Sequence, residues 1–154
     1  METITVRILR EDVYDEVAKA TDYTGSKLMD KDAGARDRIL ATDSDLADLG
    51  RFWDDAMLAT NERLKSMLVS GETKETDGKQ GYVGVIEVSK SFDKELKGNV
   101  EAALRGFFIF SIIGQWYKLA NKGEAADNLA QAGEMMDGAE RLLYSRKKPT
   151  LPKD

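Results

Sequence analysis

Residues 99–121 constrain the fold more than any other segment, because they are apolar on nearly every side when drawn as a helix. A helix turns by about 100° per residue, so a helix at a protein surface normally keeps one polar face. Here the twelve residues between Arg105 and Lys118 carry no charge, whereas a transmembrane helix needs about 20 apolar residues. The sequence therefore predicts a helix enclosed by protein, either wholly in the core or shared between the core and a subunit interface.

Three small residues, Gly106, Ser111 and Gly114, lie inside this apolar segment. Glycine within a helix costs up to about 1 kcal/mol relative to alanine. Close approach of a neighbouring backbone compensates for that cost. The small residues therefore predict tight packing of this helix against another element.

Composition narrows the possible functions. The chain has 154 residues, which is typical of one domain, and its 23 Lys and Arg against 28 Asp and Glu give a net charge of −5. That balance disfavours nucleic acid as a partner. Because the sequence contains no Cys and no His, it excludes Cys/His zinc sites, thiol redox chemistry and His-dependent triads. The first residues are too charged for a signal peptide, which predicts a cytoplasmic protein.

Two short segments have the alternation of a half-buried strand, residues 3–9 and residues 82–89. We expect them to pair, because a lone strand leaves its backbone groups unsatisfied. Between them, residues 70–81 are polar and contain three Gly, which predicts a mobile loop with a turn at Asp77 and Gly78.

The remaining segments are predicted to be mainly helical. A first helix opens at Glu11 and stops at residues 22–25, and residues 26–41 read as a loop followed by a short helix. Residues 45–69 have strong helical spacing, and the last helix begins at Glu124, directly after the glycine that ends the central helix. That tight reversal predicts antiparallel packing of the last two helices.

The predicted fold class is therefore mainly α with a minor α+β character. We expect a helical bundle of four to five helices around the central apolar helix, with a small two-stranded β-sheet. Residues 1–148 form a single domain, and residues 149–154, which contain both prolines of the chain, form an exposed tail.

Two acidic pairs near the C-terminus offer one possible chemistry, Glu124 with Asp127 and Glu134 with Asp137. All-helical nucleotide pyrophosphatases hold magnesium with such i, i+3 pairs, usually from two helices. Here both pairs lie on one helix, so a solvated helix face explains them without a metal. A magnesium-dependent hydrolase is the alternative hypothesis, and we expect no catalytic, cofactor-binding or metal site.

Basic residues mark the candidate partner contacts. They gather where the last helix ends, although cations there also favour the helix dipole, and others lie in the polar loop. The candidate contact residues are Arg141, Arg146, Lys147, Lys148, Lys74 and Lys79.

Three stretches together, residues 23–45, 111–126 and 142–149, resemble small helical proteins that bacterial prophages encode among their virion-assembly genes. In size and bundle architecture, the chain is similar to head–tail connector (adaptor) proteins, which form rings beneath the portal. The resemblance implies a non-enzymatic structural role in which the partners are other virion components and further copies of the chain. It implies no cofactor, small-molecule substrate or membrane, and it makes the polar loop and the basic tail the contact elements.

Overall fold

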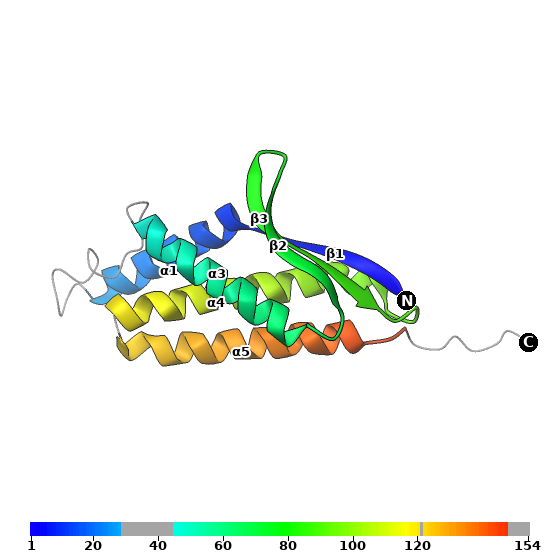
Figure 1. Ribbon diagram of the computed structural model, residues 1–154. Coiled ribbons are helices and arrows are strands. Elements are labelled where there is room, and N and C mark those ends of the chain that lie inside the picture. Colours follow the sequence, from blue (N-terminus) through cyan, green and yellow to red (C-terminus); the bar gives the residue numbers. More distant parts are fainter. Residues whose placement is uncertain (29–44, 121, 148–154) are drawn as a thin grey trace, which may run out of the picture.

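The computed structural model describes residues 1–28, 45–120 and 122–147, and a thin grey trace marks the other residues in Figure 1. In these ranges, the chain as far as Val88 holds three strands and two helices, and two long helices form most of the remainder. The elements are β1 (Glu2–Leu9), α1 (Arg10–Leu28), α3 (Leu46–Arg63), β2 (Leu68–Thr76), β3 (Lys79–Val88), the 3₁₀ turn η2 (Lys94–Leu96), α4 (Lys97–Ala120) and α5 (Lys122–Tyr144).

The sheet has three antiparallel strands in the order β1-β3-β2, so the predicted two-stranded sheet is wrong. The predicted pairing of the first strand with residues 82–89 is confirmed, since Thr5 lies opposite Val85. The error lies in residues 70–81, which form a hairpin and not a loop. Asp77 and Gly78 have φ angles of 52° and 78°, and positive φ at both central residues is what a type I′ hairpin turn requires.

The apolar segment is enclosed, as predicted. Every residue from 106 to 117 is buried or half-buried, and Leu104, Phe108 and Ile112 have no exposed surface at all. Helix α4 contacts α1, α3, α5 and β1, so it lies at the centre of the molecule (Figure 1). In the described ranges, no helix has the length and apolar character needed to cross a membrane.

Helices α4 and α5 run antiparallel along most of their length (Figure 1), and the small residues explain their close approach. A Cβ atom added to Gly114 would lie 2.6 Å from Cγ of Leu129 on α5. One added to Gly106 would lie 3.0 Å from Sδ of Met135, also on α5. Both glycines therefore allow a helix contact that larger residues would obstruct.

Several predicted helix bounds are wrong. Helix α1 continues to Leu28 through Gly25, because one glycine lowers helix stability by only about 1 kcal/mol. Helix α3 ends at Arg63 and not at residue 69, since Leu64 turns into the core and the chain then enters β2. Helix α5 starts at Lys122, two residues before the predicted start. The predicted short helix before residue 41 and the tail 149–154 lie outside the described residues.

An aromatic cluster joins the helices to the sheet. The ring of Phe108 on α4 lies 4.7 Å from the ring of Trp53 on α3 and 5.5 Å from that of Tyr82 on β3, measured between centroids. Trp53 and Tyr82 are fully buried. This cluster fixes the position of the base of the β2–β3 hairpin relative to α3.

Candidate protein-contact surfaces

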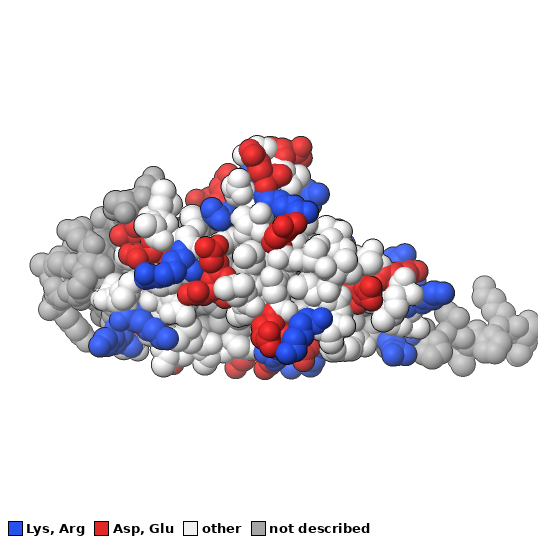
Figure 2. Space-filling view, viewed as in Figure 1, with Lys and Arg blue, Asp and Glu red and all other residues white. Residues whose placement is uncertain are grey.

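The outer half of the β2–β3 hairpin stands clear of the helices in Figure 1, and we call residues 74–81 the hairpin arm. Lys74, Glu75 and the turn residues Asp77 and Gly78 are exposed. Figure 2 shows acidic and basic side chains mixed over the arm. The arm is therefore an extended polar element whose backbone and side chains both face solvent.

Hydrogen bonds between α3 and the hairpin hold the base of the arm. Trp53 Nε1 donates to Thr73 Oγ1 at 2.9 Å, and Asn61 Nδ2 donates to the carbonyl oxygen of Gly71 at 2.9 Å. The Tyr82 hydroxyl donates to Asn61 Oδ1 at 2.8 Å. Burial raises the pKa of Tyr82 from 10.0 to about 12, so it stays a neutral donor even at pH values above 10. Both strands are thus tied to one helix, which holds the arm in a defined direction.

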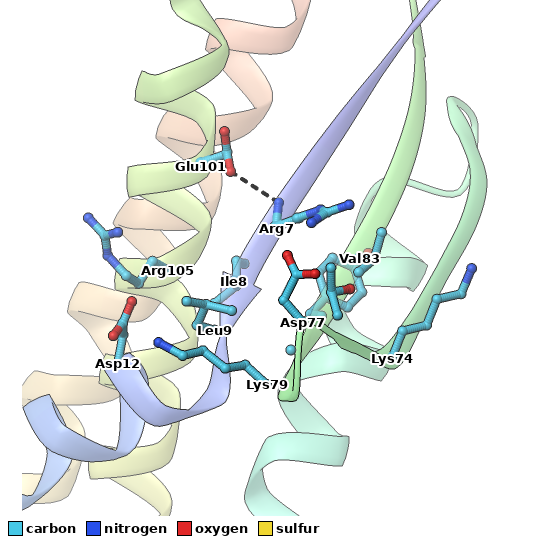
Figure 3. Close-up of a pocket in the computed structure, with 13 residues that line it drawn as sticks. Arg7, Ile8, Leu9, Asp12, Lys74, Asp77, Lys79, Val83, Glu101 and Arg105 are labelled. Carbon is cyan, nitrogen blue, oxygen red and sulfur yellow. Dashed lines mark hydrogen bonds between the residues drawn. The ribbon is translucent and has the colours of Figure 1, made fainter.

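A groove of about 490 Å³ separates the arm from β1 and the first turns of α4 (Figure 3). The Arg7 backbone N–H donates to Glu101 Oε2 at 3.1 Å, which covers part of the outer edge of β1. The side chains of Arg7 and Arg105 point in opposite directions in Figure 3. The ionic residues that line the groove are Arg7, Asp12, Lys74, Asp77, Lys79, Glu101 and Arg105. Because positive and negative side chains are mixed along the groove, its lining does not present the charge of one sign that would attract a small ion.

The structure divides the predicted contact residues between two surfaces. Lys74 and Lys79 line the groove beside the arm, and both have acidic neighbours: Lys74 lies 2.9 Å from Glu72, and Lys79 lies 3.9 Å from Glu11. The others that are described, Arg141, Arg146 and Lys147, lie at the far end of α5 (Figure 1). Lys148 lies outside the described residues.

The chain after α5 is attached to the turn that follows β3. The Lys147 N–H donates to the Ser91 carbonyl oxygen at 2.7 Å, and Arg146 pairs in a β-bridge with Phe92, which is buried. Arg146 also lines a cleft of about 190 Å³ together with Tyr144, whose side chain is 60% exposed. The basic end is therefore a fixed surface as far as residue 147.

The acidic pairs of α5 are not assembled into a metal site. Asp137 accepts a hydrogen bond from Arg63 of α3, and Glu140 lies 2.8 Å from the same guanidinium. Within residues 1–28, 45–120 and 122–147, no three carboxylates are placed to share a metal ion. Asp137 thus links two helices, and the hydrolase alternative stays a prediction without a favourable observation.

Sequence reasoning missed Asn61 and Thr73, the two polar residues that hold the hairpin. One signal could have located them. Asp-Gly, here Asp77-Gly78, is among the strongest short sequence signals for a β-hairpin, and a hairpin implies a strand of similar length on each side of the turn. The polar composition of residues 70–76 hid the first of these strands.

Comparison of the chain with protein-family models, with curated proteins and with solved structures finds no match.

Proposed function

We propose that this protein is a non-enzymatic assembly subunit of a phage or prophage particle, with a role similar to that of head–tail connector proteins. It acts in the cytoplasm of a bacterial host through contacts with other virion components and with further copies of itself. The hairpin arm, residues 74–81, is its main contact element. The basic end of α5 is a second one.

One observation carries this proposal: a polar arm projects beyond the helices and is held firmly at its base. An isolated two-stranded hairpin is at best marginally stable in water. This arm is supported by hydrogen bonds from Trp53 and Asn61 at its root. A projecting arm with a defined direction suits an assembly subunit, because ring subunits contact neighbours through extended elements.

Deleting the gene and complementing it in the lysogenic host tests the proposal. After induction, we expect the deletion to reduce infectious titre by orders of magnitude and to leave particles with unjoined heads and tails in electron micrographs. We also expect mass spectrometry to detect the chain in purified wild-type particles. Normal titre from the deletion strain, together with absence of the chain from purified particles, would overturn the proposal.

A shortened hairpin then tests the arm itself. Removing residues 75, 76, 79 and 80 leaves Lys74 and Gly81 flanking the same Asp77-Gly78 turn, and these two residues already lie opposite each other. Because two residues are removed from each strand, the pleat and the pairing are preserved. We expect this variant to fold but not to complement the deletion. Lys118→Ala, an exposed change at the end of α4, should complement fully.

A further inference from the structure

Strand β2 lies at one edge of the sheet, and its outer side pairs with no other strand of the described residues. Thr76 and Lys79 flank a two-residue turn, so they form a hydrogen-bonded pair, and pairing along the hairpin alternates from there. Consequently Gly71, Thr73 and Glu75 direct their backbone N–H and C=O groups away from β3. The bond from Asn61 to the Gly71 carbonyl agrees with this assignment. Among the described residues, no hydrogen bond reaches the outward backbone groups of Thr73 or Glu75.

The side chains along this edge alternate in charge on one face. Glu72 and Lys74 lie on the same face of β2, since Lys74 Nζ is 2.9 Å from Glu72 Oε1. Thr73 lies on the opposite face, where it accepts the hydrogen bond from Trp53. An outward-facing backbone at Thr73 is thus flanked by one anion and one cation.

We propose that β2 pairs antiparallel with β2 of a second copy of this chain, around a two-fold axis at Thr73. In this register Thr73 faces Thr73 of the other copy as a hydrogen-bonded pair, and Gly71 faces Glu75. The Gly71 carbonyl oxygen already accepts from Asn61, and its second lone pair would accept from the Glu75 N–H of the other copy. Glu72 of each copy then faces Lys74 of the other in a non-hydrogen-bonded pair, where side chains are closest. The contact joins the two sheets into one six-stranded sheet.

Charge complementarity selects this register from its neighbours. A shift of one copy by two residues in one direction would place Glu72 opposite Glu72, and a shift in the other direction would place Lys74 opposite Lys74. Like charges directly opposite each other are destabilising, whereas opposite charges stabilise the pair. Many edge strands are protected from pairing because they carry charges of one sign only, which would disfavour every register of self-pairing. The alternating pair at Glu72 and Lys74 disfavours two registers and favours the one between them.

The occupant is a second copy because the edge complements itself and needs no other sequence. The paired segment spans only residues 71–75, so the contact is small and belongs to the weak, transient class of interfaces. It is therefore a neighbour contact that becomes populated at high local concentration. This inference specifies one self-contact of the proposed assembly subunit, yet it can hold or fail independently of that function.

Cysteine cross-linking reads the register directly, since the natural chain contains no Cys. In the proposed register, residues 72 and 74 of different copies have Cα atoms roughly 4.5 Å apart, within disulfide range. Residues 72 and 72 lie diagonally, about 7–8 Å apart, which is too far. We expect mixed E72C and size-tagged K74C to form a heterodimer under mild oxidation, and each variant alone to form little dimer. Thr3→Cys, exposed on β1, is the control.

Charge exchange provides a second, independent measurement. By sedimentation over a concentration series, E72K should weaken self-association about tenfold, because it places a second lysine opposite Lys74 twice per dimer. The double variant E72K/K74E should restore association to within about threefold of the wild type. E134K, with the same change of charge on the exposed face of α5, should have no effect.

The inference is overturned if the chain stays monomeric at every concentration and the mixed cysteines do not cross-link. It is also overturned if E72C or K74C alone gives the dominant dimer, since the register is then a different one. Incorporation into particles separates this result from the proposed function. If the chain is found in particles but does not cross-link, the proposed function holds and the β2–β2 contact is refuted. If the dimer cross-links but the chain is absent from particles, the contact holds and the proposed function is refuted.

Discussion

Replacing Gly114 with alanine should destabilise the packing of α4 against α5, although alanine is the better helix former. A Cβ atom at this position would lie 2.6 Å from both Cγ and Cδ2 of Leu129, and 3.3 Å from the backbone nitrogen of Leu129. Carbon atoms do not persist at 2.6 Å, so the Leu129 side chain must move. Its own backbone nitrogen, close to the new methyl group, limits how far α5 can relax.

A matched glycine gives the magnitude. Gly133 lies on α5, and no atom from elsewhere in the described chain is within 4 Å of its added Cβ. Gly133→Ala should therefore show the full gain in helix propensity, about 1 kcal/mol. Gly114→Ala receives the same gain but loses roughly 1–3 kcal/mol to overpacking. The difference between the two variants, about 1–3 kcal/mol, isolates the cost of the clash.

Urea unfolding followed by tryptophan fluorescence measures these changes. For a chain of this size, each kcal/mol also corresponds to roughly 2–4 °C in Tm. Gly106→Ala should fall between the two variants, because its Cβ would meet the flexible thioether of Met135 at 3.0 Å. Equal stability of Gly114→Ala and Gly133→Ala, with unchanged urea dependence, would refute the argument that Gly114 is required for close helix packing.

Three further predictions concern the hairpin. Thr73→Val keeps the shape but leaves Trp53 Nε1 without its acceptor, so the free energy of unfolding in urea should fall by about 1–3 kcal/mol. Gly78→Ala should cost about 1 kcal/mol in the same assay, because φ is 78° there although the space is open. Burial raises the pKa of Tyr82 to about 12 from 10.0, so its contribution to stability is complete below pH 10 and is lost as the pH rises through 12. Across that window, the stability of the wild type relative to Tyr82→Phe should fall by about 2–3 kcal/mol, measured by urea unfolding at each pH.

The enclosed central helix was predictable because its signal does not depend on partners. A segment that carries no charge over three helical turns and is too short to cross a bilayer has to be covered by protein. Helix α4 is covered in this way. The antiparallel packing of α4 and α5 was also predicted, although Gly123, the residue expected to end the central helix, lies in the first turn of α5. Pairing of β1 with β3 followed from the need to satisfy two backbones. In each case a local pattern and one general physical requirement were sufficient.

The third strand was not predictable from hydrophobic pattern, because β2 buries little apolar surface. Its nine residues include Ser, Gly, Lys and two each of Glu and Thr, and none of them is fully buried. What makes the segment a strand lies elsewhere: a turn at Asp77-Gly78, a partner strand in β3 and hydrogen bonds from α3. Composition described its solvent exposure correctly but not its backbone conformation. The sequence placed candidate contacts on the arm, at Lys74 and Lys79, but not the edge of β2, since the key groups of that edge are backbone atoms.

The core and the proposed contact surface are linked by a short chain of contacts. Phe108 of the central helix packs against Trp53, Trp53 donates its N–H to Thr73, and Thr73 is the residue on the proposed two-fold axis. The direction of the β2 edge is therefore determined by the most buried part of the molecule. Such an arrangement reduces the conformational entropy that a strand loses on pairing, because the edge is ordered before a partner arrives. A five-residue contact can then contribute to assembly, although the same five residues on a flexible loop would not.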